Sequence, residues 1–342
     1  MPLDRAASAP APPGALEEVA EQRERGPLQR ALASQAFWVT VALLAICAGM
    51  SWLQPSAFAS TENLYNITRN FAFIGIMALG MTVVIITGGI DLSVGSLMGM
   101  VAIVAGLVLQ AGGTWWIAMA AGMAAGVAAG AVNGALIAYV RLSPFVVTLG
   151  MLSVARSLAI VLSENKMIYD FGPDAEIVYA IGGGATFGVA NPVWLLLILT
   201  LAFGAVLNFT TWGRHLYAIG GNEQAARLTG VPVDRVKLQA YVVSGATAGL
   251  AAVMIIGWQG SAINALGQGY ELRVIASTVI GGANLVGGEG GAYGALIGAA
   301  LIEVIRNSLL MAGVDANWQG AFVGAFIVLA VLLEKIRGRR RE

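Results

Sequence analysis

The chain has 342 residues, of which 58% are hydrophobic and only 11% are charged, and its formal net charge is zero. Soluble domains usually carry about 25% charged residues, so this composition excludes a soluble globular protein and indicates a polytopic membrane protein. The single cysteine, Cys47, excludes an intrachain disulfide.

Residues 1–35 precede the first apolar run and are rich in Ala, Pro, Glu and Arg. This composition predicts a disordered cytoplasmic tail rather than a secretory signal peptide. A helix needs about 20 apolar residues to cross a bilayer, and residues 36–334 predict an all-α transmembrane domain with about ten such helices. The predicted spans are 36–54, 67–87, 92–111, 115–139, 143–163, 193–210, 239–258, 272–286, 291–311 and 318–334.

The distribution of Lys and Arg predicts the orientation of these spans. Most of these residues fall in segments that share one side of the membrane when the N-terminus is cytoplasmic. The positive-inside rule then places both termini in the cytoplasm, including the basic C-terminus at 335–342. Residues 164–192 are accordingly an outer loop, and residues 211–238 are an inner loop.

Residues 88–95 read Gly-Gly-Ile-Asp-Leu-Ser-Val-Gly and interrupt the apolar sequence. An ionised Asp at the centre of a bilayer costs roughly 2.5–3.5 kcal/mol, and non-helical backbone at that depth must be buried in protein or line a water-filled cavity. The segment therefore predicts a broken helix beside a polar route. Asp91 either caps the next helix by accepting backbone N–H bonds or contacts a solute or an ion.

A similar segment, Gly-Gly-Ala-Asn-Leu-Val-Gly-Gly, occupies residues 281–288 and places Asn284 where the first has Asp91. Paired Gly-interrupted segments in corresponding halves point to a transport route, and the alternative is chance similarity in a chain with 45 glycines. The pattern predicts two pseudo-repeated halves with Gly-broken helices. The predicted substrate-pathway residues are Asn66, Asn70, Phe71, Asp91, Ser93, Ser96 and Asn284.

Three further charges lie in or near apolar spans. Glu303 and Arg306 are three residues apart, so they share a helix face and can pair. Arg156 is expected to reach a headgroup or the outer acidic loop by snorkelling.

The inner loop predicts a short helix with its own start and stop residues. Asn222 is a suitable N-cap, Gly230 is a suitable C′ residue, and Glu223 and Arg227 form an i, i+4 pair. Ala225, Ala226 and Leu228 give the helix a small apolar surface. Because so short a helix is marginal alone in water, docking against another surface would stabilise it.

Three motifs occur in order and carry a resemblance: Gly-Gly-Ile-Asp-Leu-Ser-Val-Gly-Ser at 88–96, Tyr-Ala-Ile-Gly-Gly-Asn-Glu-Gln-Ala-Ala-Arg-Leu-Thr-Gly-Val at 217–231, and Gly-Tyr-Glu-Leu at 269–272 followed by Val-Ile-Gly-Gly at 279–282. Over roughly residues 36–334 the chain resembles the ribose-type family of ABC sugar-importer permeases, and more distantly the branched-chain amino-acid permeases. Glu289 departs from the family, in which a basic residue is frequent at this place.

The resemblance implies a permease subunit in the lipid bilayer of a bacterial inner membrane. Its implied partners are a second permease subunit, identical or different, a cytoplasmic ABC ATPase and an extracytoplasmic sugar-binding protein. It also implies that the inner helix couples to the ATPase. The implied coupling residues are Gly220, Gly221, Asn222, Glu223, Gln224, Ala225, Ala226, Arg227, Leu228 and Gly230.

Several other functions lack the residues that they need. No Lys follows a Gly-x-x-x-x-Gly, so the chain is not itself an ATPase. The only histidine, His215, lies in the inner loop, which argues against an intramembrane serine protease and a His-rich metal site. We expect no enzyme activity, cofactor, metal or nucleic-acid partner. The alternative function is a secondary transporter driven by H⁺ or Na⁺, with Asp91 as the ion ligand.

Overall fold

The computed structural model describes residues 32, 34–315, 318, 320–321 and 324–325. Nearly all of the predicted tail, most of the predicted span 318–334 and the basic C-terminus 335–342 lie outside these residues. In chain order the elements are α3 (Gln35–Leu53), α4 (Thr61–Ile86), α5 (Val94–Gln110), α6 (Trp115–Ala138), α7 (Pro144–Leu162), η1 (Gly172–Asp174), α8 (Ala175–Gly182), β1 (Ala185–Thr186), β2 (Val189–Ala190), α9 (Asn191–Phe209), α10 (Thr211–Gly221), α11 (Glu223–Leu228), α12 (Val233–Gln259), α13 (Tyr270–Ile280) and α14 (Ala292–Met311).

The predicted all-α membrane fold is confirmed. Seven of the described helices are long and apolar enough to cross a membrane, and α5, with 17 residues, is a shorter apolar helix. The two-residue strands β1 and β2 pair antiparallel and form the only sheet in the described residues.

The predicted span 272–286 differs from the structure. In its place lies α13, which has 11 residues and is therefore about 16 Å long, roughly half the thickness of a bilayer core. Gly269 precedes α13 in the left-handed region with φ 78°, and Gly282 follows it with φ 103°. These glycines end the helix on both sides, which a hydropathy window does not detect.

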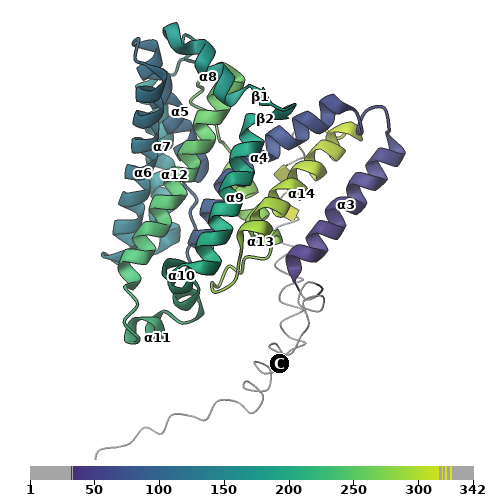
Figure 1. The fold of residues 1–342 in the computed structure, drawn as a ribbon. Helices are drawn as coiled ribbons and strands as arrows, with labels where there is room; N and C mark the ends of the chain where they lie inside the picture. Colours follow the sequence, from purple (N-terminus) through teal and green to yellow (C-terminus); the bar gives the residue numbers. More distant parts are fainter. Residues whose placement is uncertain (1–31, 33, 316–317, 319, 322–323, 326–342) are drawn as a thin grey trace, which may run out of the picture.

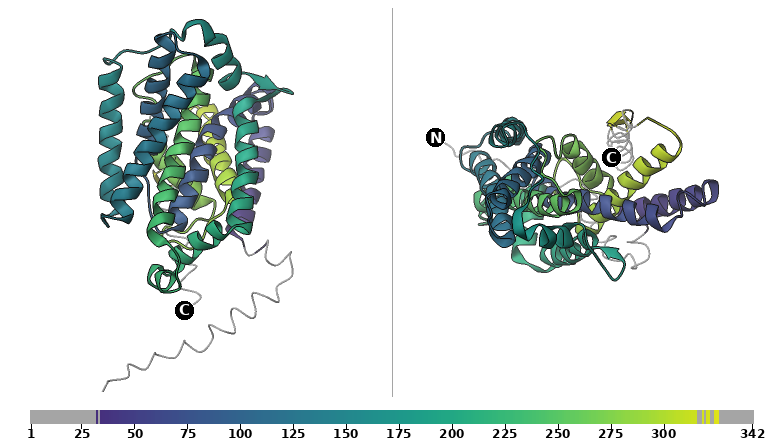
Figure 2. Two further views of the ribbon diagram at one scale, coloured as in Figure 1. Left: turned by 60° about the vertical axis from the view of Figure 1, so that its left-hand side comes forward. Right: turned by 90° about the horizontal axis from the view of Figure 1, so that it is seen from above.

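α4 is the central helix and is largely buried, packing against α12, α14, α13 and α9. α3 lies at one edge of the molecule, while α6 and α7 lie at the opposite edge (Figures 1 and 2). α8 and the β1–β2 hairpin lie at one end of the helices, and α10 and α11 lie at the other (Figure 1). We call these the α8 end and the α11 end. The predicted loops 164–192 and 211–238 therefore lie at opposite ends.

A stripe of glycines lets α6 approach its neighbours closely. A Cβ on Gly126 would lie 2.7 Å from the Gly245 carbonyl oxygen, and one on Gly134 would lie 2.8 Å from the Leu238 Cα. Small residues at such spacing allow close helix packing where hydrocarbon surrounds the protein. This close approach holds α12 against α6, next to the first glycine break.

Candidate functional site

The first glycine break follows the end of α4. Gly88 has φ 75°, and the Gly89 N–H donates to the Val84 carbonyl at 3.1 Å. This six-residue closure is the Schellman arrangement, which favours glycine at the left-handed position. The chain then turns through Ile90 and Asp91 into α5.

Asp91 is completely buried within this break. Its Oδ1 accepts the Ser93 N–H at 3.0 Å and the Ser93 hydroxyl at 2.5 Å, while its Oδ2 accepts the Ser244 hydroxyl of α12 at 2.7 Å. The Asn133 amide of α6 donates to the Ser93 Oγ at 3.0 Å. Asp91 thus accepts a backbone N–H, as in the first of the two predicted alternatives, but from Ser93, the N-cap residue that precedes α5, and the network also joins the break to α6 and α12.

The second break has the same local chemistry. Gly282 takes the left-handed position, and the Ala283 N–H donates to the Thr278 carbonyl at 3.1 Å. The Asn284 Oδ1 then accepts the Val286 N–H at 2.9 Å, as the Asp91 Oδ1 accepts the N–H two residues later. Asn284 follows the left-handed Gly282 by two positions, whereas Asp91 follows the left-handed Gly88 by three. Asn284 is also only partly buried. The repeat is therefore similar in geometry but not identical.

The two breaks meet each other at the α11 end. The Gly288 N–H of the second break donates to the Ile86 carbonyl at the end of α4, at 2.9 Å. α10 packs on this contact: a Cβ on Gly220 would overlap both bonded atoms, and the Tyr217 hydroxyl donates to the Gly290 carbonyl at 2.8 Å. We call this meeting point of α4, the second break and α10 the glycine junction.

Gly220 and Gly221 are the last residues of α10 rather than part of the short helix that follows. This helix, α11, begins immediately after Asn222, whose Oδ1 accepts the Ala225 N–H at 2.9 Å. It ends before Gly230, which has φ 86°. Asn222 as the N-cap and Gly230 as the stop residue are confirmed. Asn222 alone links α11 to α10, and α10 in turn contacts the glycine junction.

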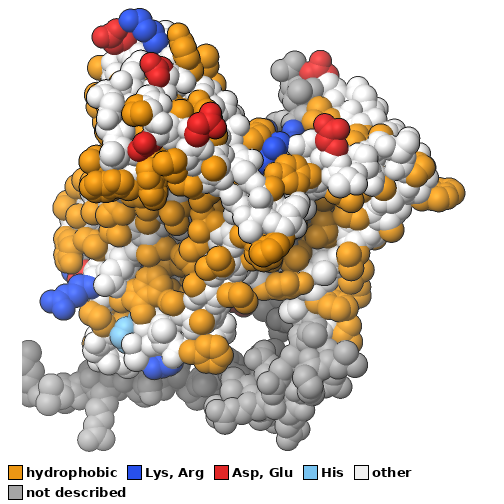
Figure 3. Space-filling model, turned by 45° about the horizontal axis from the view of Figure 1, so that its top comes forward, with side chains coloured by type: hydrophobic (Ala, Val, Ile, Leu, Met, Phe, Trp, Pro, Cys, Tyr) orange, Lys and Arg blue, Asp and Glu red, His pale blue; other side chains and the backbone are white. Residues whose placement is uncertain are grey.

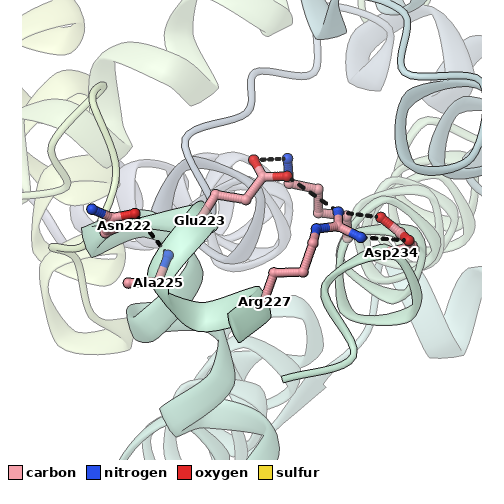
Figure 4. Close-up of polar contacts among 6 residues, drawn as sticks. Asn222, Glu223, Ala225, Arg227 and Asp234 are labelled. Atoms are coloured by element: carbon pink, nitrogen blue, oxygen red, sulfur yellow. Dashed lines mark hydrogen bonds and ion pairs between the residues drawn. The ribbon is translucent and has the colours of Figure 1, made fainter. Parts of the chain in front are cut away.

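Ion pairs fix the orientation of α11 on α12 (Figure 4). The Arg227 guanidinium donates to both oxygens of Asp234, at 2.7 and 3.0 Å, and lies 3.5 Å from the Glu223 carboxylate. Lys237 donates to the other oxygen of Glu223 at 2.5 Å. Hydrogen bonding to Asp234 raises the pKa of Arg227 above its usual value, so the guanidinium stays charged.

α11 presents one apolar face outward and buries the other. Leu228 is 88% exposed, whereas Ala226 is buried among residues of α4, α10 and α12. Ala226 therefore does not belong to the predicted apolar surface. Beside α11 lies a groove of about 510 Å³, which is lined by Ile137, Ala138, Arg141, Leu142, Ser143, Pro144, Glu223, Gln224, Arg227, Asp234 and Lys237.

The predicted pathway residues do not form a single cluster. Asp91, Ser93 and Ser96 are buried at the first break, whereas Asn66, Asn70 and Phe71 lie in the first three turns of α4, towards the α8 end. Asn284 lies at the second break. The sequence did not predict three residues that complete the buried network and the glycine junction, which are Asn133, Tyr217 and Ser244. No motif in the sequence around them indicates that they bind the two breaks.

Irregular backbone between α12 and α13 runs beside α5. Ala262 packs at Gly106, and the Gly267 carbonyl packs at Gly95 near the start of α5. The Arg156 guanidinium of α7 donates to the carbonyls of Asn264 and Leu266 at 2.5 and 2.9 Å. Arg156 therefore does not snorkel as predicted, because irregular backbone at membrane depth needs partners from the protein.

We expect Arg156→Leu to destabilise the protein by roughly 2 kcal/mol or more, because each unsatisfied buried carbonyl costs about 1–3 kcal/mol. Thermal unfolding in detergent, followed by size-exclusion fluorescence, measures the change. Arg214→Leu is the control, because Arg214 is exposed and makes no ion pair in the described residues. Equal melting temperatures for the two variants would contradict the structural role of Arg156.

Comparison with known proteins places this architecture in a family. A family model described as "Branched-chain amino acid transport system / permease component" matches residues 63–331. The ribose import permease protein RbsC of Escherichia coli K12 is 39% identical over 295 residues, which cover 86% of this chain and 92% of the relative. RbsC of Bacillus subtilis 168 is 39% identical and covers 84% of this chain and 88% of its own length.

The L-arabinose transport system permease protein AraH of Escherichia coli K12 is 33% identical over 83% of this chain and 86% of its own length. A solved ABC transporter structure covers 88% of this chain and 98% of its own, at 17% identity and a TM-score of 0.47, and is too distant to support a comparison of sites. The extent of these matches shows that this multi-pass membrane protein belongs to the ABC permease family described as the permease component of the branched-chain amino acid transport system.

Proposed function

We propose that this chain is the membrane subunit of an ABC importer and carries a small sugar into the cytoplasm by alternating access. The observation that supports this most is the direct connection from α11 through α10 to the end of α4 and to the second glycine break. The sugar class is taken from the relatives, which are named as ribose and L-arabinose permeases.

In this mechanism the α11 end is cytoplasmic and receives the ATPase. Leu228 and the groove beside α11 form the docking surface, and the ion pairs to α12 keep α11 aligned. Movement of α11 is carried by α10 to the glycine junction, where glycines permit backbone rotation. The ATPase shifts the equilibrium between the two transporter states only if it contacts the permease differently in each state. The nucleotide bound to the ATPase supplies this difference in contacts.

The proposed partners are a second permease subunit beside this chain, the ATPase at the α11 end and a sugar-binding protein at the α8 end. Both termini are cytoplasmic in this arrangement. The protein lies in the inner membrane of a bacterium.

The decisive test is transport by the reconstituted assembly. Proteoliposomes that contain the permease and its ATPase, with the binding protein supplied outside, are expected to accumulate radiolabelled D-ribose or L-arabinose when ATP is enclosed with the ATPase. An ionophore should leave this uptake unchanged. Sugar accumulation by the permease alone under a proton or sodium gradient would overturn the proposal and favour the secondary transporter.

We expect Leu228→Asp to reduce retention of the ATPase on immobilised permease by about tenfold or more, because a central apolar contact in an interface is worth about 2 kcal/mol. The fold should survive, since Leu228 is 88% exposed. Phe187→Asp is a matched control at the α8 end, because Phe187 is 93% exposed. If Phe187→Asp loses the ATPase and Leu228→Asp retains it, the docking surface is at the wrong end.

A further inference from the structure

The α8 end of the molecule is hollowed between two lobes, and Lys or Arg side chains lie in the hollow (Figure 3). α4 brings Arg69 to this end, eight residues after its start at Thr61, or about 12 Å along the helix. Arg69 forms no ion pair in the part of the chain that the structure describes. An unneutralised arginine within an apolar helix is costly and generally serves a function.

Aromatic side chains hold the Arg69 guanidinium in place. It lies 4.4 Å from the ring centroid of Trp258 on α12 and 5.4 Å from that of Tyr65. Phe73 stacks on Trp258 with ring centroids 5.7 Å apart, so the indole is itself fixed. The electrons of the ring face attract the cation, and more strongly where water is excluded. The side chain is therefore positioned by the core and does not snorkel to the membrane surface.

The fixed guanidinium has donors to spare. Its Nη2 donates to the Asn66 Oδ1 at 2.6 Å, while its Nε is buried and has no partner in the described residues. A guanidinium offers five N–H donors in one plane. The neighbouring Asn70 is only partly buried and makes no side-chain hydrogen bond within the described chain. The Nη N–H groups that do not bind Asn66 and the unbonded Asn70 amide thus adjoin each other on α4.

We propose that Arg69, positioned by Trp258 and flanked by Asn66 and Asn70, contacts the hydroxyl oxygens of the sugar as it enters from the α8 end. This inference rests on the proposed function and adds a solute-contact site within the permease itself. A planar donor group suits a polyhydroxylated solute, because neighbouring hydroxyl oxygens can accept two N–H bonds at once. The uncompensated positive charge disfavours cationic solutes.

Thiol labelling of the full transporter tests the site. In a Cys47→Ser background, Asn70→Cys should react from the outside with the membrane-impermeant reagent methanethiosulfonate ethylsulfonate. D-ribose or L-arabinose at 10 mM should slow that reaction at least threefold, and Arg69→Gln should remove the protection while leaving the labelling. Leu201→Cys is the control, because Leu201 is 75% exposed midway along the apolar helix α9, where hydrocarbon would exclude the charged reagent, so it should stay unlabelled.

Failure of this site is distinguishable from failure of the proposed function. If ATP drives uptake but the Asn70→Cys thiol does not react, or neither sugar slows its reaction, the proposed site is wrong. The importer function then still stands. Sugar protection without ATP-driven uptake overturns the importer function and supports the site. If Asn70→Cys does not assemble, Tyr65→Cys, one turn before Arg69 on the face of α4 that carries Arg69, reports access and protection at the guanidinium, and the same two outcomes apply.

Discussion

A transporter with Gly220→Ala is expected to lose most of its ATP-driven sugar uptake while still binding its ATPase. A Cβ on Gly220 would overlap the Ile86 carbonyl oxygen and the Gly288 amide nitrogen, two backbone atoms that are hydrogen-bonded to each other at 2.9 Å. Backbone cannot rotate aside as a side chain can, so α10 must separate from the junction. Overpacking costs about 1–3 kcal/mol, which corresponds to about a 5- to 150-fold change in an equilibrium between two transporter states.

The adjacent glycine supplies the control for this prediction. A Cβ on Gly221 would meet nothing within 4 Å, so Gly221→Ala should transport at close to the wild-type rate. Uptake into proteoliposomes and ATP hydrolysis should both be measured, because a separated junction predicts hydrolysis without matching transport. Equal uptake by the two variants would contradict a role for the α10 contact in coupling.

Hydropathy predicted the long helices well because each of them satisfies its own backbone hydrogen bonds. α13 is the informative exception, since residues 272–286 are apolar enough for a span but hold nine residues of an 11-residue helix and then the second glycine break. An irregular segment precedes α13, and its carbonyls are bound by Arg156 of α7, more than 100 residues away. A contact of that separation leaves no periodic trace in the sequence.

Local side-chain chemistry was predictable at the candidate site, whereas the meeting of its parts was not. Asn222 and Gly230 mark the ends of α11 through bonds to residues close in sequence. The contact of Gly220 with the end of α4 and the second break, and the bond from Ser244 to Asp91, join segments far apart in the chain. The two glycine breaks and α11 could therefore be predicted from the sequence, whereas the contact through α10 that connects them could not.

The strongest effect on stability is expected from Asp91→Ala. This change leaves the Ser93 N–H and the hydroxyls of Ser93 and Ser244 without an acceptor in a completely buried site. Each unsatisfied buried donor costs about 1–3 kcal/mol, so a total loss of roughly 3 kcal/mol or more is expected. Thermal unfolding and expression of folded protein measure it. Asn284→Ala is the matched control in the second break, where one partly exposed bond is lost and about 1 kcal/mol is expected.

Asp91→Asn separates a structural carboxylate from one that acts in transport. The amide keeps an oxygen to accept from Ser93, and the Ser244 hydroxyl can rotate to accept from the new NH₂ group. A structural role therefore predicts a folded, partly active transporter whose uptake still follows ATP. A folded Asp91→Asn protein that has lost all uptake would instead require the negative charge in the transport step. Loss of a proton or sodium dependence that the wild type shows would identify Asp91 as an ion ligand. The hydrogen bonds at Asp91 favour the first result, because the chain itself supplies donors to both carboxylate oxygens.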